Sequence, residues 1–325
     1  MCALSTICLP VQQELRLVED EISKNISSEV DVVRSASAYV LQNGGKRVRP
    51  ALLLLTAKLL GANAAQAAPL AAAMEMIHAA SLLHDDVLDN ATIRRGKPSS
   101  NVKWGNQISI LVGDFLWCRA SNVIITYQNS RILESAISSV EKTTEGEILE
   151  IIKSNDFGIS EDEYLKIITL KTAMLFACSC HIGSIFANAS EKNEEALKNF
   201  GLNLGIAFQL ADDVLDYNSS EEKFGKKAGT DLCEGKLTLP VISVLKKCSE
   251  KESHVIREAL LANSMDITIF KEITSILNRY GTLESALVLA HNYSKKAKAQ
   301  VEAFKQSIEK DALLALADYA VGRDV

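Results

Sequence analysis

Residues 74–96 read MEMIHAASLLHDDVLDNATIRRG, an apolar stretch that runs into three aspartates and two arginines. On a helix, residues four apart share a face, so Asp85 and Asp89 project together with Asp86 beside them. Three carboxylates on one face repel each other unless a cation lies between them. Their hard oxygen atoms suit Mg²⁺, which also binds substrate phosphates. For this stretch alone, the alternative is a solvated acidic helix end.

The pentapeptide DDVLD occurs a second time, at residues 212–216, and again it follows an apolar run. Chance is a poor explanation for this recurrence. We expect two helices to present these clusters to one cavity, where several Mg²⁺ ions grip a diphosphate. The predicted metal ligands are the six aspartates of the two pentapeptides: Asp85, Asp86, Asp89, Asp212, Asp213 and Asp216.

Basic residues cluster in a second type of motif, NGGKRVRP at residues 43–50. The glycines can end one helix, and Pro50 suits the first position of the next. The basic side chains then lie at a helix N-terminus, where backbone N–H groups and the helix dipole favour anions. The pattern predicts a diphosphate site, and the alternative is a helix–helix turn with solvated charges.

Three further polar features interrupt the helical pattern. Lys171 lies in the apolar run ITLKTAMLFACS, where a lysine needs an anionic partner or a route to water. Residues 145–147, Glu-Gly-Glu, are interpreted as solvated surface in preference to a metal contact. Residues 218–240 form a long polar segment, which we interpret as a closing lid.

The composition predicts a single all-α domain over residues 1–325. Hydrophobic residues make up 47% of the chain, only five prolines occur, and long runs of Ala, Leu, Ile, Glu and Lys favour helices. Residues 11–42 are predicted to form two helices separated at Ser27 and Ser28, within an N-terminal helical segment spanning 1–42. No strand–helix alternation occurs.

Charge and cysteine usage limit the partners and the compartment. The net charge of −6 and the lack of a basic stripe argue against nucleic acid. Seven scattered cysteines indicate a reducing cytoplasm. Cys178 and His181 could share a helix face as metal ligands, but a packing surface is favoured because no second ligand pair occurs. We expect no signal peptide and no integral membrane segment.

Taken together, these motifs resemble the trans-polyprenyl diphosphate synthases of medium and long product length, within the isoprenoid synthase family. The resemblance runs from Gly44 to the C-terminus. It rests on GGKRVRP (44–50), LLHDDVLDNATIRRGKPSSN (82–101), LVGDF (111–115), Lys171-Thr172 and the second DDVLD. It implies a helical bundle with a central cavity that condenses isopentenyl diphosphate with an allylic diphosphate, with Mg²⁺ as cofactor, about three ions per site. It also implies a homodimer.

The resemblance also implies roles for individual residues. Isopentenyl diphosphate would be held by Lys46, Arg49, His78 and Arg95. The allylic diphosphate would be held by Arg94, Lys171, Lys226 and Lys236. Thr172 and Gln209 would lie near the reacting carbon, and the catalytic set would be Lys171, Thr172, Gln209, Asp85 and Asp212. A histidine at position 78 taken alone is more often a satisfied core residue.

Small residues before the first aspartate cluster predict a long product. In the resembled family, bulky residues four or five positions before the first aspartate block the growing chain, and here these positions are Ser81 and Ala80. Ile77 and Met74 lie one and two turns further along, and each turn advances about 5.4 Å. We expect products of about C30–C50. The alternative is that these are packing residues unrelated to product length.

Other classes remain open at this point. A terpene cyclase shares the first aspartate cluster but usually lacks the second, and a head-to-head synthase spaces its aspartates differently. A non-catalytic subunit of a heteromeric prenyl synthase typically loses one or both clusters. A shorter-chain farnesyl or geranylgeranyl diphosphate synthase keeps all the motifs.

Overall fold

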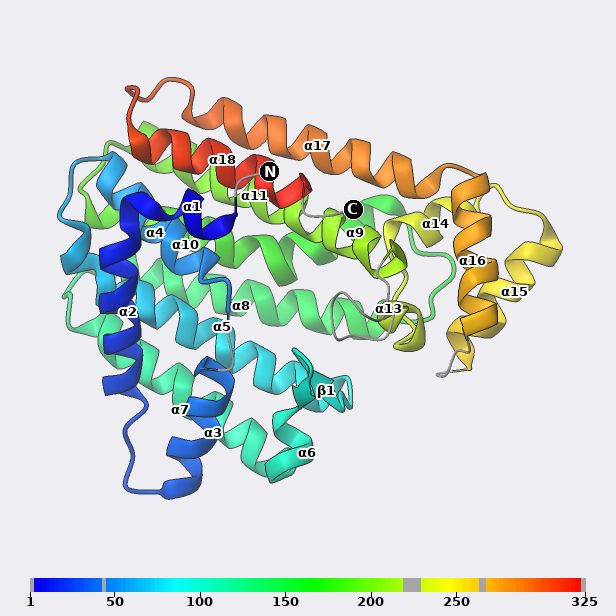
Figure 1. The fold of residues 1–325 in the computed structure, drawn as a ribbon, viewed down its shortest axis with the longest axis horizontal. Coiled ribbons are helices and arrows are strands. Elements are labelled where there is room, and N and C mark those ends of the chain that lie inside the picture. Colours follow the sequence, from blue (N-terminus) through cyan, green and yellow to red (C-terminus); the bar gives the residue numbers. More distant parts are fainter. Residues whose placement is uncertain (1–2, 43–44, 219–228, 263–266, 323–325) are drawn as a thin grey trace. The chain divides into compact units, whose positions relative to one another are not determined.

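The computed structural model describes residues 3–42, 45–218, 229–262 and 267–322 (Figure 1). In these ranges the helices are joined by turns and loops, and the strands are confined to one hairpin in which β1 (Ile93–Arg94) pairs antiparallel with β2 (Lys97–Pro98). The predicted all-α class is therefore confirmed. The chain divides into two compact units: Met1–Val140, Leu175–Gly201 and Lys298–Leu316 form the first, and Glu141–Met174, Leu202–Ala297 and Ala317–Val325 the second.

The first unit is built on helices from the N-terminal half. In chain order these elements are α1 (Leu4–Ile7), η1 (Leu9–Val11), α2 (Gln12–Asn25), α3 (Asp31–Gln42), α4 (Val48–Leu59), η2 (Ala64–Ala67), α5 (Ala68–Leu88), α6 (Ser100–Trp104), α7 (Asn106–Ile125) and the start of α8 (Ser130–Lys153). The two helices expected on either side of Ser27 and Ser28 are confirmed as α2 and α3. Later segments add α10 (Met174–Phe186) and the first turns of α11 (Glu191–Asn218).

Helix α5 is the central element of the first unit. Its residues from Ala68 to Leu83 are apolar apart from Glu75, His78 and Ser81, a pattern that favours burial on every side. It packs against α7, α2 and α4, and α5 and α7 run side by side in Figure 1. Met74, Met76 and Leu83 are fully buried. This burial fixes the C-terminal end of α5, where the first aspartate cluster lies.

The second unit contains the later helices. These are the end of α8, α9 (Glu161–Ile168), a π-helical turn at Thr169–Ala173, most of α11, α13 (Thr230–Cys233), α14 (Leu239–Leu245), α15 (Glu250–Leu261), α16 (Ile267–Arg279), most of α17 (Thr282–Val301) and the end of α18 (Ile308–Gly322). A single apolar cluster spans α9, α11 and α14–α17. Within the predicted lid, residues 219–228 lie outside the described residues, while Leu232 and Leu237 belong to this core.

Candidate active site

The first aspartate cluster lies at the C-terminal end of α5, which ends at Leu88 with Asp89 as the cap. Asp86 is 2% exposed and accepts a hydrogen bond from Nε of Arg94, and the two form an ion pair. Burial raises the pKa of Asp86, against the opposing charge of Arg94. Asp85 and Asp89 are half-buried and present their carboxylates from the same end of the helix. The predicted position of the cluster at the end of this helix is confirmed, and Asp86 is its most buried member.

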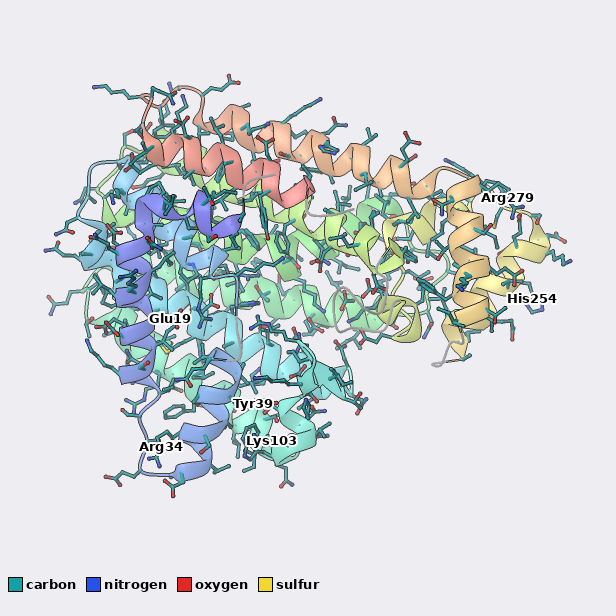
Figure 2. All side chains as sticks on the ribbon, in the orientation of Figure 1. Glu19, Arg34, Tyr39, Lys103, His254 and Arg279 are labelled. Carbon is teal, nitrogen blue, oxygen red and sulfur yellow. The ribbon has the colours of Figure 1, made fainter. Side chains whose placement is uncertain are left out.

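The loop after α5 is held by a small aromatic cluster. The hydroxyl of Tyr39 donates a hydrogen bond to the carbonyl oxygen of Pro98 at 2.8 Å. The ammonium of Lys103 lies 4.3 Å from the Tyr39 ring centroid and 4.6 Å from that of Trp104, and Figure 2 labels Tyr39 and Lys103. Such cation–π contacts stabilise the partners modestly at the surface. They fix the hairpin that carries Arg94.

The predicted basic site gathers in the same unit. The guanidinium of Arg49 lies 4.7 Å from the centroid of the Phe176 ring, and its Nε is buried with no hydrogen-bond partner among the described residues. Burial, opposed by Glu75 and reinforced by Arg95, lowers the pKa of Arg49 to about 10. Burial also lowers the pKa of His78 well below its usual value, and the charges of nearby arginines lower it further: Arg49, Arg95, Arg94 and Arg47. Lys46 is exposed.

The positive charges around the neutral His78 repel one another, and this repulsion costs stability unless an anion binds among them. A buried guanidinium N–H without an acceptor points the same way, because such groups are normally satisfied in folded proteins. The chemistry of this group therefore suits a phosphate ligand.

The start of α4 differs from the prediction. Pro50 is the third residue of α4, not its first, because Arg47 in left-handed geometry (φ 48°) caps the helix.

Arg47 was missed by sequence reasoning and has a structural role. It donates hydrogen bonds to Glu19 at 2.6 Å, to Glu75 at 2.7 Å and to the carbonyl oxygen of Leu41 at 2.6 Å. Glu75 is 5% exposed and lies on α5. Arg47 thus joins α2, the end of α3 and α5 at the start of α4, and it sets the position from which Arg49 projects.

The second aspartate cluster lies on α11, and its middle member is again bound by the protein. Asp213 is 4% exposed, accepts a hydrogen bond from the hydroxyl of Tyr164, and accepts another from Nε2 of Gln209 at 2.7 Å. Thr172 donates from Oγ1 to Oε1 of Gln209 at 2.9 Å. Burial raises the pKa of Asp213 to about 7, with Asp212 and Glu150 adding to the shift against these hydrogen bonds. The structure brings Thr172 and Gln209 together, as predicted.

The outer aspartates of this second cluster differ from Asp213. Asp212 is exposed and Asp216 is half-buried. Asp216 also accepts a hydrogen bond from the backbone N–H of Asp231 at 3.1 Å, and burial with the charges of Asp216 and Asp213 raises the pKa of Asp231 well above its usual value. Sequence reasoning missed Asp231 and Tyr164. Both lie far from Asp213 in sequence, and no local pattern links them to it.

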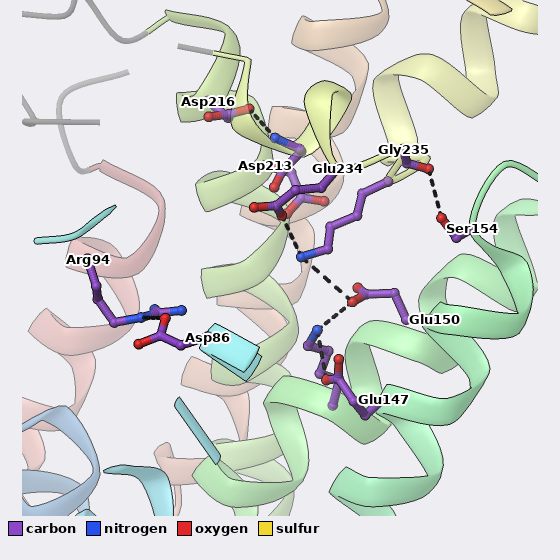
Figure 3. Close-up of polar contacts among 12 residues, drawn as sticks. Asp86, Arg94, Glu147, Glu150, Ser154, Asp213, Asp216, Glu234 and Gly235 are labelled. Carbon is purple, nitrogen blue, oxygen red and sulfur yellow. Dashed lines mark hydrogen bonds and ion pairs between the residues drawn. The ribbon is translucent and has the colours of Figure 1, made fainter. Parts of the chain in front are cut away.

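Lys171 lies in the π-helical turn between α9 and α10, and π-helical turns are frequent at functional sites. Its ammonium forms ion pairs with Glu147 at 2.8 Å and with Glu150, which confirms the prediction of an anionic partner. The interpretation of residues 145–147 as solvated surface is wrong for Glu147, which is 13% exposed, because α8 turns this side chain towards Lys171. Figure 3 shows the network around Glu147 and Glu150.

Lys236 joins the same network. Its ammonium lies 2.8 Å from Glu234 and 4.0 Å from Glu150. Glu150 was missed, although its spacing of three from Glu147 on α8 places both on one face. Lys226 lies outside the described residues, so its predicted role remains a prediction.

Within the described residues, the two aspartate clusters form no preassembled metal cage. Among the described residues, no three Asp, Glu, His or Cys side chains lie close enough together to hold a metal ion. Mg²⁺ does not require such a cage, because it commonly binds through one or two carboxylates, several waters and substrate phosphates. The accessible carboxylates in each cluster fit that mode. Cys178 and His181 instead pack around Ser135, whose hydroxyl lies 3.0 Å from Nδ1 of His181, so the packing interpretation is favoured.

The residues predicted to govern product length lie on α5. Met74, Ile77 and Ala80 are buried, with exposed fractions of 0%, 4% and 5%. The hydroxyl of Ser81 donates to the carbonyl oxygen of His78 at 2.9 Å, so it adds no free polar group to this face. The role of these residues remains a prediction.

Comparison with known proteins identifies the family. Residues 30–277 match the family model described as polyprenyl synthetase, and the chain therefore belongs to this family of prenyltransferases. It is 35% identical over 311 residues to octaprenyl diphosphate synthase from Haemophilus influenzae, covering 96% of this chain and 94% of that protein. It is 36% identical over 315 residues to a short chain isoprenyl diphosphate synthase from Methanothermobacter thermautotrophicus, covering 95% and 96%.

A solved structure shows the same fold. Polyprenyl synthase from Caulobacter crescentus, complexed with calcium and isoprenyl diphosphate, superimposes with a TM-score of 0.95 at 36% identity, covering 99% of this chain and 98% of that one. The chain is accordingly a trans-prenyltransferase with the all-α isoprenoid synthase fold, a family that uses divalent metal ions.

Two helical stretches of the described chain are long and apolar enough to cross a membrane by length and composition, Asn106–Ile125 and Glu161–Phe186. The most apolar window of the second is 56% buried, and core helices of soluble proteins pass the same test. The second stretch, Glu161–Phe186, also contains the charged Lys171. These helices are weak evidence for a membrane segment, and the family is one of soluble enzymes.

Proposed function

We propose that this enzyme condenses isopentenyl diphosphate head-to-tail with an allylic diphosphate and releases diphosphate. The observation that carries the proposal is the arrangement shared by the two DDVLD clusters. In each, the second aspartate, Asp86 or Asp213, is buried and hydrogen-bonded, while the flanking aspartates are more accessible. This repeated pattern, a buried second aspartate with more accessible carboxylates beside it, supports a metal-binding role for each cluster.

Asp85, Asp89, Asp212 and Asp216 would hold Mg²⁺, about three ions per site, while Asp86 and Asp213 fix the two clusters. Bound Mg²⁺ supplies neutralisation of the negative charge that develops on the departing diphosphate. The protein contributes the cations of Arg94, Lys171, Lys226 and Lys236 to the same charge. A site of this kind needs no side-chain nucleophile.

Isopentenyl diphosphate is assigned to the basic group of the first unit, formed by Lys46, Arg49, His78 and Arg95. Support comes from the unpartnered Nε of Arg49 and from the depressed pKa of His78. A neutral His78 donates one hydrogen bond to a phosphate oxygen without adding to the repulsion among the arginines. Binding of the anion relieves that repulsion.

The reacting carbon is assigned to the neighbourhood of Thr172 and Gln209. Loss of diphosphate leaves an allylic cation, the double bond of isopentenyl diphosphate attacks it, and the resulting cation loses a proton to the released diphosphate. The oxygens of Thr172 and Gln209 are fixed by their mutual hydrogen bond and stabilise positive charge without trapping it. Water has to be kept from this carbon, because it would otherwise quench the cation.

Product length is proposed to be about C30–C50, because small side chains at Ala80 and Ser81 leave room for a growing chain along α5. Identity alone does not decide this, since the octaprenyl and short chain relatives are equally similar. We further propose a cytoplasmic homodimer. Helix α7 carries exposed apolar side chains at Leu111 and Ile125, with exposed fractions of 62% and 56%, which favour a partner surface.

The testing experiment is a product assay. Purified protein is incubated with Mg²⁺, isopentenyl diphosphate and, in parallel, geranyl, farnesyl and geranylgeranyl diphosphate, and the products are sized by mass spectrometry. Products of about C30 or longer are expected. Products that stop at farnesyl or geranylgeranyl length would retain the chemistry and overturn the proposed length. A folded protein that binds every primer and extends none would overturn the activity and favour a partner-subunit role.

A further inference from the structure

The two described lysines assigned to the allylic diphosphate are already engaged by carboxylates. Lys171 forms ion pairs with Glu147 and Glu150, and Lys236 with Glu234 and Glu150. All five side chains are between 13% and 24% exposed. Glu150 is the member common to both lysines, as the dashed lines around it in Figure 3 show.

The C-terminal part of α8 and the turn that follows it contact the segments that carry both lysines. Gly146 packs against the backbone of Lys171, and a Cβ there would lie 2.4 Å from its backbone nitrogen. Beyond the helix, Ser154 and Asn155 donate hydrogen bonds to the carbonyl oxygen of Gly235 at 3.4 and 3.3 Å. Gly235 has φ +70° and directly precedes Lys236. Residues 146–155 therefore set the positions of both lysines.

The chemistry of the network is a competition for donors. An ammonium group donates through three N–H bonds and accepts none. Each N–H bond that points at a carboxylate becomes available to a diphosphate oxygen only when that contact breaks. Two partly buried ammonium groups that share a site repel each other, and a carboxylate between them removes that repulsion. In this network the carboxylate between the two ammonium groups is that of Glu150.

We propose that Glu147 and Glu150 are positioning residues that hold Lys171 and Lys236 in place before substrate binds, and that Glu150 competes with diphosphate for both lysines. This inference rests on the proposed role of the two lysines. Its consequence is that the enzyme binds diphosphate less tightly than its lysines allow, and therefore releases the product diphosphate more readily. A purely structural ion-pair network makes the opposite prediction, since breaking it disturbs the lysines and weakens binding.

The test is calorimetric binding of inorganic diphosphate in the presence of Mg²⁺ to wild type and Glu150→Gln. Glutamine keeps the shape of the side chain and removes its charge. We expect Glu150→Gln to bind diphosphate about threefold to tenfold more tightly. Glu145→Gln is the matched control, because Glu145 lies on the same helix, is exposed, and forms an ion pair with Lys142 at 2.9 Å. The control should bind as wild type does.

Two further variants keep the result decisive. Glu147→Gln leaves Glu150 in place and should tighten binding by a smaller factor, so it serves if Glu150→Gln folds poorly. Lys171→Gln should weaken binding about tenfold. If Lys171→Gln binds as wild type does, the assigned role of Lys171 fails. If Lys171→Gln weakens binding while neither glutamate variant tightens it, the competition is overturned and the role of Lys171 stands.

Discussion

Gly146 and Lys171 are in backbone-to-backbone contact: a Cβ built on Gly146 would lie 2.4 Å from the backbone nitrogen of Lys171. The contact joins α8 to the π-helical turn that carries Lys171 and Thr172. Only a residue without a side chain permits this approach. The distance between α8 and that turn decides whether Glu147 and Glu150 reach the lysine.

Gly146→Ala is therefore expected to destabilise the protein by about 1–3 kcal/mol, because the added methyl group forces the two segments apart. It should also lower turnover, since Lys171 shifts with its turn. Thermal unfolding and steady-state kinetics measure the two effects. Glu141→Ala, at an exposed position earlier on α8, is the control and should change neither. Wild-type stability in Gly146→Ala would contradict the close approach.

Asp213→Asn is expected to stabilise the metal-free protein at about pH 8. The pKa of Asp213 is raised to about 7 in the folded protein, whereas the pKa of an aspartate in the unfolded chain is about 3.9. Between these values the folded chain keeps a proton that the unfolded chain has lost. The stability contributed by this group is thus fully present below about pH 4 and is lost as the pH rises through about 7.

Asparagine removes this titration, so its advantage in unfolding free energy over wild type should grow by on the order of 2 kcal/mol between about pH 5 and pH 8. Thermal unfolding with a chelator present, at both pH values, gives the measurement. Asp212→Asn removes the same charge from an exposed position and is the matched control. A pH-independent difference for Asp213→Asn would show that the carboxylate of Asp213 ionises normally in the fold.

The sequence predicted the helices that carry the site better than it predicted which side chains pair with one another. Apolar periodicity and the repeated DDVLD located α5 and α11 and the faces that carry the aspartates, because helix geometry fixes side chains three and four apart. The lysine in an apolar run predicted an anionic partner for Lys171 for the same local reason. Its actual partners required knowing that α8 packs on its turn.

The missed residues share one property, which is that their partners are distant in sequence. Tyr164 bonds to Asp213 across 49 positions, and Arg47 to Glu75 across 28. Hydrogen-bond partners of this kind depend on helix packing, which periodicity does not specify. Glu147 was grouped with Glu145, which is indeed exposed. Two residues apart on α8, the two side chains point in different directions, and only Glu147 faces Lys171.

Asp85→Ala is expected to lower turnover roughly 100-fold or more while leaving the fold intact. Asp85 is half-buried, and the variant retains the ion pair between the buried Asp86 and Arg94 at this end of α5. Product formation and thermal unfolding are measured together. Glu134→Ala, which removes an exposed carboxylate from α8, should keep full activity. Substantial activity in Asp85→Ala would exclude it as a metal ligand.

Ala80→Tyr is expected to shorten the products, because a phenol ring at this buried position blocks the space beside α5 one turn before Asp85. Overpacking also strains the core by about 1–3 kcal/mol, so shortening must be separated from general damage. Ala79→Tyr is the matched control: Ala79 is equally buried at 4% exposed but points about 100° away around the helix. If the chain grows along the Ala80 face, only Ala80→Tyr shifts the product distribution in the mass spectrum. Equal shortening in both variants would mean that damage to α5, and not a blocked path, limits length, and an unchanged distribution in Ala80→Tyr would place the growing chain elsewhere.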